Sequence, residues 1–327
     1  MGSLRWGILG TGWIAHAQTA DLLAHGFTVT AAGSRTRTGA AEFAAEFGIP
    51  NAHESYESLV ADDSVDVIYV ATPHPMHVSN SLLALDAGKH VLVEKPFALT
   101  AREARELVDL AARKHLVVLE AMWTRFLPHM VRLREIIRAG TIGEVHTLIA
   151  DHNQLLSDDP EGRLRNPALG GGALLDLGIY PVSFAWDLFG EPSRVLASGT
   201  KTPTGVDRQT AIILEYPHDQ RAVLHCALDT PGPNRAAVIG TTGRIELESV
   251  WYTPTSFTVF DSRGEPTERY RSDVTGRGMQ YQAWELERLV ADGPDAADLL
   301  PPEQSVKTME TLDEVRRQIG LTFPGEP

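Results

Sequence analysis

The stretch GILGTGWIAH, residues 7–16, places Gly10 and Gly12 between an apolar run and the start of a helical pattern. In such a strand–loop–helix unit the first Gly permits a tight turn, and the second lets the backbone approach a pyrophosphate. Ala15 takes the third position, where a small side chain lets helix and strand pack closely. The helix N-terminus adds free N–H groups and a partial positive charge. This order of elements predicts a dinucleotide-binding loop whose cofactor contacts are Gly10, Gly12, Trp13 and Ile14.

Short apolar runs recur through the first part of the chain, at 28–33, 65–71, 89–94 and 115–120. They are rich in Val, Ile and Leu, as strands that are buried on both faces should be. Amphipathic stretches separate them, and the one near 100–115 opens with Thr100 as an N-cap and Glu103 three residues later. Repeated units of this length imply parallel strands joined by right-handed crossovers. We therefore predict a doubly wound α/β domain of the Rossmann type over residues 1–121.

From residue 122 the rhythm of the chain changes. A helical stretch that ends at Gly140 leads into a strand-like run at 144–153, and a helix is predicted near 173–189. Strand candidates separated by turn residues then follow at 193–201, 209–216, 220–229, 235–240, 243–248 and 256–261, before helices near 278–292 and 303–319. We predict an α+β domain over residues 122–327 with a largely antiparallel open sheet. Such a sheet commonly forms a subunit interface, which favours a homodimer or homotetramer.

The composition excludes several classes of protein. A formal charge of −14 and a pI near 5.3 argue against a nucleic-acid partner, because such partners require clustered basic surface. Cys226 is the only cysteine, so an intrachain disulfide and a zinc site built on cysteines are both excluded. No signal peptide is visible, and no apolar stretch approaches the ~20 residues of a membrane span. We expect a cytoplasmic protein with no membrane partner.

The end of the second predicted strand indicates which dinucleotide is bound. A site specific for NAD would place Asp or Glu there to bind the ribose hydroxyls. This chain instead reads AAGSRTRTG at 31–39. Ser34 supplies a hydroxyl, and Arg35 supplies a guanidinium suited to a phosphate monoester, with Arg37 close behind. The alternative is that these are ordinary solvated loop residues. The missing acid favours NADP, with NAD still possible.

The next strand ends in Ala71 and Thr72, close to the expected position of a nicotinamide ribose. Pro73 stiffens the turn and His77 heads the following helix, so Thr72, Pro73 and His77 are all predicted near the cofactor. His74 and His77 could be mistaken for a metal pair. No further ligand cluster is obvious from the sequence, and we predict no metal site.

The stretch VLVEKPFALT, residues 91–100, ends a buried strand with Glu94 and Lys95. Of the 29 basic residues only five are Lys, so a Lys at this position is either an accident or a chemical choice. An Arg stays charged and binds anions with a planar fork, whereas a Lys ammonium is a compact donor whose pKa changes with its surroundings. The residue type therefore makes Lys95 a candidate for chemistry.

These motifs together resemble the Gfo/Idh/MocA oxidoreductase family: GILGTGWIA at the N-terminus, ATPHPMH at 71–77 and EKP at 94–96. EAMWTRFLP at 120–128 and GGGALLDLGIYP at 170–181 resemble its branch of dimeric dihydrodiol dehydrogenases and NADP-dependent D-xylose dehydrogenases. The resemblance covers the chain to about residue 190 by motif and the remainder by element order. It implies that Glu94, Lys95, Trp123 and Arg125 lie near the nicotinamide or the substrate.

Asp176 and Tyr180 are four residues apart and share one face if this stretch is helical. Pro181 lacks a backbone donor and would kink that helix. Many family members carry His where this chain has Tyr180, whereas in the dihydrodiol branch Tyr is the proposed acid/base. A free Tyr has a pKa near about 10, so a cation is needed to stabilise the phenolate at neutral pH. We predict that Lys95 supplies it and that Asp176 orients the substrate or Lys95. Weaker candidates for substrate contacts are Asn153, Arg165, Asn166 and Trp251.

The sequence thus predicts an NADP-dependent oxidoreductase that acts on a hydroxyl of a sugar or cyclic polyol, such as an aldose or a trans-dihydrodiol. A second hypothesis keeps a tightly held NAD and cleaves glycosides without net redox change. A third is a non-catalytic nucleotide-sensing regulator, which would not require the pair of Lys95 and Tyr180.

Overall fold

The computed structural model describes residues 4–326, and these divide into two compact units. The first unit comprises the described part of Met1–Trp123 together with Gly276–Val306. The second comprises Thr124–Thr275 and the described part of Lys307–Pro327. The predicted boundary after residue 121 lies close to the first crossing of the chain between the units. The second domain was predicted as the continuous range 122–327. In the structure, residues 276–306 within that range belong to the first unit.

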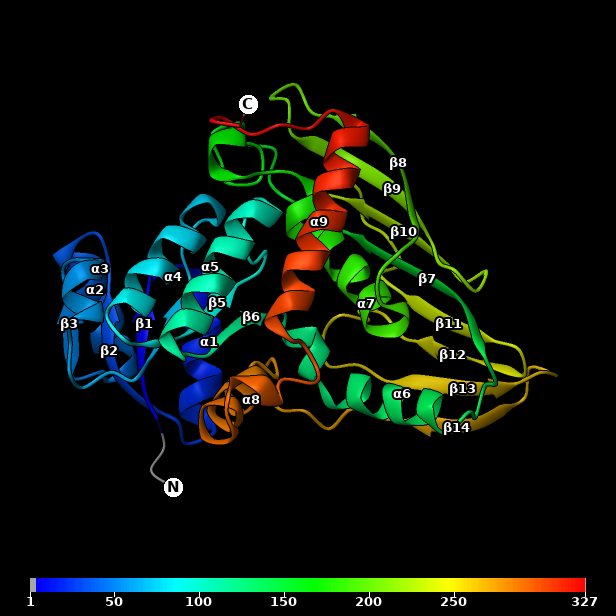
Figure 1. Cartoon of the computed structure of the whole chain (residues 1–327), viewed down its shortest axis with the longest axis horizontal. Coiled ribbons are helices and arrows are strands. Elements are labelled where there is room, and N and C mark those ends of the chain that lie inside the picture. Colours follow the sequence, from blue (N-terminus) through cyan, green and yellow to red (C-terminus); the bar gives the residue numbers. More distant parts are fainter. Residues whose placement is uncertain (1–3, 327) are drawn as a thin grey trace. The chain divides into compact units, whose positions relative to one another are not determined.

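The first unit is built on a six-stranded sheet in the order β3-β2-β1-β4-β5-β6, in which every pairing is parallel (Figure 1). This is the predicted doubly wound sheet, and its strand order reverses between β1 and β4. Ligands of such sheets bind at the carboxyl ends of the strands beside this reversal. Its strands are β1 (Arg5–Leu9), β2 (Thr28–Gly33), β3 (Asn51–His53), β4 (Val67–Val70), β5 (His90–Glu94) and β6 (Val118–Ala121).

The helices of the first unit alternate with these strands, as the apolar periodicity predicted. Its helical elements are α1 (Trp13–Ala24), α2 (Arg37–Phe47), α3 (Tyr56–Val60), η1 (His74–Met76), α4 (His77–Asp86), α5 (Ala101–Lys114), α8 (Gln280–Asp292) and η5 (Pro294–Ala296). Thr100 is the N-cap as predicted, because the Glu103 backbone N–H donates to Thr100 Oγ1 at 3.2 Å. The Glu103 side chain accepts from the N–H of Leu99, one residue before the N-cap, at 3.1 Å, so the capping box is shifted by one residue.

Helix α8 is joined to the first unit by side-chain hydrogen bonds and by buried apolar residues. The Trp6 indole N–H of β1 donates to Glu287 Oε1 at 2.9 Å, and Gln282 Nε2 donates to Gln18 Oε1 of α1 at 2.8 Å. The apolar side chains of Leu286 and Leu289 are buried. These contacts fix the segment 276–306 against α1 and the central strands.

The second unit is an eight-stranded sheet in the order β14-β13-β12-β11-β7-β10-β9-β8, in which only the β7–β10 pair is parallel. The predicted open antiparallel sheet is therefore confirmed, with β14 as an additional strand. Its strands are β7 (Val145–Asn153), β8 (Arg194–Lys201), β9 (Asp207–Glu215), β10 (Arg221–Ala227), β11 (Ala236–Gly240), β12 (Gly243–Leu247), β13 (Phe257–Asp261) and β14 (Pro266–Tyr270).

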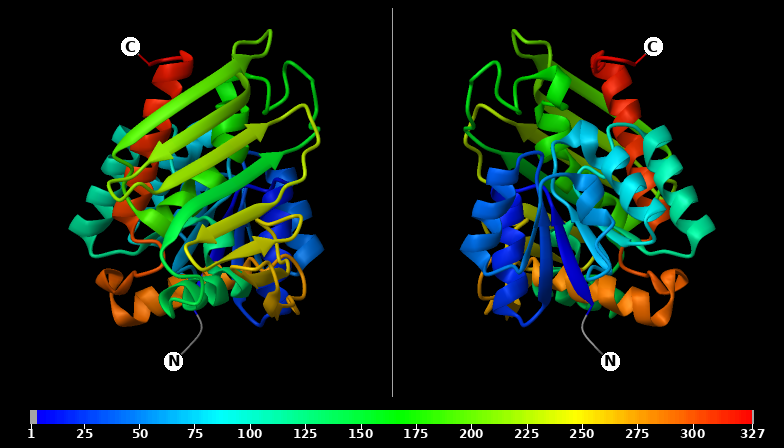
Figure 2. Two further views of the ribbon diagram at one scale, coloured as in Figure 1. Left: turned by 90° about the vertical axis from the view of Figure 1, so that its right-hand side faces the viewer. Right: turned by 90° about the vertical axis from the view of Figure 1, so that its left-hand side faces the viewer.

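Helices cover one face of this sheet, and within the second unit the other face carries none (Figures 1 and 2). The helical elements are α6 (Pro128–Arg138), η3 (Pro167–Leu169), the π-helical turn η4 (Leu174–Gly178) and α7 (Ile179–Phe189). Two further elements are shared between the units by sequence: η2 (Trp123–Phe126) and α9 (Pro302–Ile319).

The stretch Pro167–Phe189 is long and apolar enough to span a membrane by composition, with a mean hydropathy of 1.3. The expectation that no stretch approaches this length is therefore wrong for this segment. In the structure 89% of its most apolar window is buried, because η4 and α7 pack across β7 and β10. Burial against a sheet is the ordinary reason for such a sequence in a core helix.

Candidate functional site

The glycine loop between β1 and α1 has the geometry that its sequence predicts. Gly10 has a φ of +100°, and an added Cβ would lie 2.7 Å from the carbonyl oxygen of Ala71, so only Gly fits where β1 and β4 end side by side. Gly12 is extended, and an added Cβ there would meet no atom of the described residues within 4 Å. The open space over Gly12 and the uncapped N-terminus of α1 fit a pyrophosphate group.

The residues after β2 form an exposed polar corner. Ser34 is half-buried, Arg35 and Arg37 are exposed, and Thr36 caps α2 by accepting from the Gly39 N–H at 3.2 Å. Ser34 Oγ and Thr36 Oγ1 both face Gly39, at 3.1 and 3.0 Å from the position of an added Cβ. Burial raises the pKa of Tyr56, and the Arg35 guanidinium opposes that rise through its positive charge and a hydrogen bond. This contact holds Arg35 at the end of β2.

The turn after β4 is braced by a buried histidine. His77 Nε2 lies 2.8 Å from the Thr72 carbonyl oxygen and Nδ1 lies 2.7 Å from the Pro96 carbonyl oxygen. Its side chain is 1% exposed, and the ring ties the ends of β4 and β5 together. Thr72 Oγ1 accepts from Asn80 Nδ2 at 3.1 Å, and Pro73 is half-buried between these anchors. We therefore assign His77 a positioning role.

Lys95 follows β5 directly and is half-buried, and its peptide bond to Pro96 is cis. The preceding Glu94 is 5% exposed and accepts a hydrogen bond from the Tyr69 hydroxyl of β4. Burial raises the pKa of Glu94 to about 7, against the opposing effects of Tyr69 and Lys95. Neighbouring residues along a strand point their side chains to opposite faces. The buried Glu94 side chain therefore anchors the end of β5 from one face, and Lys95 follows this anchored end directly.

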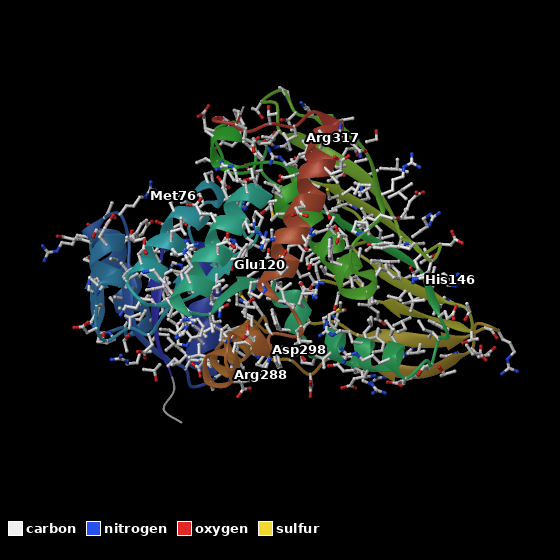
Figure 3. The ribbon with its side chains drawn as sticks, viewed as in Figure 1. Met76, Glu120, His146, Arg288, Asp298 and Arg317 are labelled. Carbon is white, nitrogen blue, oxygen red and sulfur yellow. The ribbon has the colours of Figure 1, made fainter. Side chains whose placement is uncertain are left out.

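Glu120 on β6 fixes the chain just beyond Lys95. Its Oε1 accepts from the Phe97 N–H at 3.1 Å, and its Oε2 accepts from the Ser305 hydroxyl at 2.7 Å. Figure 3 shows Glu120 among the central elements of the first unit, close to the beginning of α9. The strand end that presents Lys95 is therefore held by carboxylates on two neighbouring strands.

In the second unit, Asp176 and Tyr180 lie on the predicted helical stretch, with a π-helical turn over 174–178. This turn lies just before Pro181, and such widened turns are frequent at functional sites. Asp207, which is 1% exposed, accepts from the Leu174 N–H at 2.7 Å and thereby anchors the start of the turn. Burial raises the pKa of Asp207 to about 6. Asp176 accepts from Arg163 Nη1 at 3.0 Å, a partner that the sequence did not predict.

Tyr180 lies in an aromatic cluster with His152 and Tyr252. The His152 ring stacks on Tyr252 with 3.6 Å between centroids, and the Tyr180 centroid lies 5.0 Å from that of His152 and 5.3 Å from that of Tyr252. Gln154 Nε2 lies 2.8 Å from His152 Nε2 and donates to the Tyr252 hydroxyl at 3.2 Å. Burial raises the pKa of Tyr252 to about 12, so it remains a neutral phenol near pH 7.

Sequence reasoning missed His152, Gln154 and Tyr252. The signal was available for two of them, because His152 in β7 and Gln154 just after it are two residues apart, which puts their side chains on one face of an extended chain. Tyr252 follows β12 in a loop, and nothing in its sequence neighbourhood places it beside β7.

Arg125, which the resemblance places near the nicotinamide or the substrate, is part of a buried ion-pair network. It is 3% exposed, and its guanidinium donates to the Ser183 carbonyl oxygen at 2.9 Å and pairs with Asp187 at 3.3 Å. Arg134 binds the other oxygen of Asp187 at 2.7 Å and donates to the Arg125 carbonyl oxygen at 2.7 Å. This buried network fixes α6 to α7. Trp123, which belongs to the first unit, is 5% exposed.

The four weaker candidates for substrate contacts have structural partners. Trp251 is fully buried, stacks on Phe184 and donates to the Asp151 carbonyl oxygen at 2.8 Å. Asn153 Nδ2 donates to Asp151 at 2.7 Å, while its Oδ1 lies 2.7 Å from His225 Nδ1. Arg165 donates to the Ser157 carbonyl oxygen at 3.2 Å, and Asn166 caps η3. Packing and capping account for these residues.

Across residues 4–326, no group of three or more His, Cys, Asp and Glu side chains is arranged to hold a metal ion. The candidate site residues form two groups, one in each structural unit. The first unit holds the dinucleotide loop after β1 and a lysine after β5, and the second holds a tyrosine with a carboxylate and an aromatic cluster.

The chain belongs to the Gfo/Idh/MocA oxidoreductase family. Residues 4–122 match the oxidoreductase family with an NAD-binding Rossmann fold, and residues 130–246 match the GFO/IDH/MocA C-terminal domain. The chain is thus a nicotinamide-dinucleotide-dependent oxidoreductase, as its motifs predicted.

Two curated relatives match almost the whole chain. Trans-1,2-dihydrobenzene-1,2-diol dehydrogenase of Mus musculus is 38% identical over 98% of this chain and 98% of its own length. The D-xylose 1-dehydrogenase (NADP(+)) of Hypocrea jecorina is 37% identical over 98% of this chain and 93% of its own. The predicted branch of the family is therefore confirmed.

Solved structures share the fold. A 3-ketoreductase from Actinomadura kijaniata in complex with NADP and TDP-benzene has a TM-score of 0.86 at 25% identity, covering 97% of this chain and 98% of that one. Aldose-aldose oxidoreductase from Caulobacter crescentus, complexed with glycerol, has a TM-score of 0.87 at 24% identity over 97% of both chains.

Proposed function

We propose that this protein is an NADP-dependent dehydrogenase that oxidises a ring or anomeric hydroxyl of a sugar or cyclic polyol, or reduces the corresponding carbonyl. The observation that carries the proposal is the open glycine loop of the first unit, with Lys95 at the end of β5. Tyr180, beside His152 in the second unit, is the proposed acid/base. The relatives named for a dihydrodiol and for D-xylose support hydroxyl-bearing carbon as the target.

In this proposal Tyr180 and Lys95 handle the proton. Tyr180 takes the proton of the substrate hydroxyl as its oxygen becomes a carbonyl oxygen, and the Lys95 ammonium stabilises the phenolate and polarises the same oxygen. A bound nicotinamide would supply a hydride acceptor or donor at its own ring carbon C4. Asp176, held by Arg163, orients a neighbouring substrate hydroxyl as an acceptor.

The experiment that tests the proposal follows absorbance at the reduced-nicotinamide band with NADP and then NAD, across aldoses, inositols and trans-dihydrodiols. Rapid reduction of NADP by one substrate class supports the dehydrogenase and names the class. No reduction across the panel, with a nucleotide already bound to the purified protein, would favour the redox-neutral glycoside reaction instead.

Arg35 is expected to set the preference for NADP. Its guanidinium, held by Tyr56 at the end of β2, is placed to bind a 2′-phosphate. Arg35→Ala removes a charge-assisted contact of ~1.5–3 kcal/mol, so the Kd for NADP should rise roughly 10- to 100-fold while that for NAD changes little. Calorimetric titration with both cofactors measures this. Equal loss for both would contradict the assignment, and Arg102→Ala, on the exposed face of α5, is the charge-matched control.

We further propose that the helix-free face of the second unit's sheet binds a second copy of the chain. Ile149, Val223 and Ile213 are 48%, 44% and 40% exposed and stand in register on β7, β10 and β9. Ala237 and Leu196 extend this row to β11 and β8. A row of exposed apolar side chains across a helix-free sheet face is typical of an interaction surface, and a self-complementary face forms closed dimers.

Val223→Glu should convert the assembly to a species of half the size or smaller, because the charge stands in the middle of the apolar row. Sedimentation of the wild type and the variant measures the masses. Leu23→Glu, which changes an apolar residue of α1 that is 37% exposed, is the matched control. A wild type that sediments as a monomer, or a Val223 variant that keeps the wild-type mass, would refute this interface.

A further inference from the structure

A second segment of the chain reaches the glycine loop of the first unit. Gly276-Arg277-Gly278 lies just before α8, and both glycines have left-handed φ values, +75° and +80°. Buried Asp21 of α1 accepts from the N–H groups of Arg277 at 3.1 Å and Met279 at 2.9 Å. An added Cβ on Gly276 would lie 2.4 Å from Asp21 Oδ1. The backbone of this segment is therefore fixed to α1.

The fixed backbone places the Arg277 side chain over two indole rings. Its guanidinium carbon lies 5.0 Å from the ring centroid of Trp13 and 5.5 Å from that of Trp123. Trp13 is the first residue of α1 and is 64% exposed, an unusual exposure for so large an apolar side chain. Arg277 is also exposed, and within residues 4–326 no carboxylate side chain pairs with its guanidinium. An unpaired cation thus stands beside the start of α1.

The glycine loop itself lacks a cation for a diphosphate. Its residues offer backbone N–H groups. In the first turn of α1, His16 Nε2 lies 3.2 Å from Glu46 Oε2, and His16 Nδ1 lies 3.0 Å from the Gly12 carbonyl oxygen. A dinucleotide brings two negative charges to this point, and a chain of net charge −14 repels them. An arginine binds phosphate oxygens through two parallel N–H groups.

We propose that Arg277 binds the diphosphate of the nicotinamide dinucleotide, with the rings of Trp13 and Trp123 holding its guanidinium in place over the glycine loop. This inference rests on the proposed NADP-dependent function and adds to it a cofactor contact from a segment outside the N-terminal motif. The segment 276–306 would thereby contribute a cofactor contact to the unit that contains the glycine loop.

Calorimetric titration of three ligands tests the proposal: NADP, 2′-phospho-ADP-ribose and adenosine 2′-monophosphate. The first two contain the diphosphate and the third does not. For Arg277→Ala we expect the Kd of both diphosphate ligands to rise about tenfold or more, with that of adenosine 2′-monophosphate unchanged. Arg277→Lys should restore part of the loss, because it keeps the charge but not the planar fork.

Arg271→Ala is the control, since it removes an exposed arginine six residues earlier in the chain, in the second unit. An Arg277→Ala variant that binds NADP as the wild type does would overturn the proposal and leave Arg277 a packing role. Equal weakening of all three ligands would also overturn it, because the effect would then not concern the diphosphate. If the wild type binds none of the three ligands, the proposed NADP-dependent function itself fails.

Discussion

Replacing Tyr180 with Phe is expected to lower kcat by roughly 10²–10⁴-fold, the usual contribution of a positioned acid or base. Phe keeps the ring that packs against His152 and Tyr252 at 5.0 and 5.3 Å, and so removes little besides the hydroxyl. The Kd for NADP should stay unchanged because the dinucleotide loop belongs to the first unit. Steady-state kinetics and calorimetry together measure both quantities. Tyr270→Phe, in β14, is the control for loss of a hydroxyl.

Lys95→Ala should cause a loss similar to that of Tyr180→Phe, and the double variant should be little worse than either single one. When two groups act on the same proton transfer, the losses in turnover caused by removing each of them do not multiply. When the groups act independently, the two losses multiply. Single variants that keep turnover within a few fold of wild type would show that neither residue handles the proton. A double variant with the product of the two losses would show that Lys95 and Tyr180 act separately.

Asp187→Ala is expected to destabilise the second unit by about 3–5 kcal/mol, the cost of leaving buried charge without its partner. Asp187 is the shared partner of Arg125 and Arg134, and the three side chains are 6%, 3% and 7% exposed. Its loss leaves two guanidinium groups buried between α6 and α7, the helix that carries Tyr180.

Urea unfolding followed by circular dichroism measures this destabilisation. The control is Glu314→Ala, which breaks a pair with Arg317, a side chain that is 71% exposed. Exposed pairs contribute about 1 kcal/mol or less, so the control should unfold near the wild-type midpoint. A loss no larger for Asp187→Ala than for Glu314→Ala would mean that the buried network does not stabilise the fold.

Apolar periodicity predicted most strands of both sheets, because buried strands need Val, Ile and Leu in short runs. It missed β3, Asn51–His53, whose three residues are polar or small and which pairs only with β2. It also missed β14, Pro266–Tyr270, an edge strand that begins with Pro and is mostly exposed. Edge strands have a partner on one side only, so their sequences carry a weaker apolar pattern.

The return of the chain at 276–306 could not be predicted from periodicity. An amphipathic pattern shows that α8 buries one face, but not which unit receives it. The choice depends on single polar contacts such as Trp6 with Glu287 and Asp21 with the backbone of Met279. These partners are separated by more than 250 residues, and no local pattern links them.

The candidate site was predictable where spacing carries the chemistry. The loop glycines, Lys95 at a strand end, and Asp176 with Tyr180 on one helical stretch all follow from local order. Arg125 was placed at the cofactor by resemblance, whereas its burial with Asp187 depends on the packing of α6 on α7. His77 was placed near the cofactor from its position at the head of a helix, and its two carbonyl partners come from the segments after β4 and after β5.

The central claim is that hydride passes directly between a hydroxyl-bearing carbon and the nicotinamide. The measurement that tests it uses the substrate class found in the panel, labelled with deuterium at the reacting carbon, followed by mass spectrometry of the cofactor after turnover. We predict one deuterium per molecule in the reduced NADP and an oxidised product that has lost it. Deuterium that returns to the product, with an aglycone released and no reduced cofactor, would contradict a dehydrogenase and identify the redox-neutral reaction.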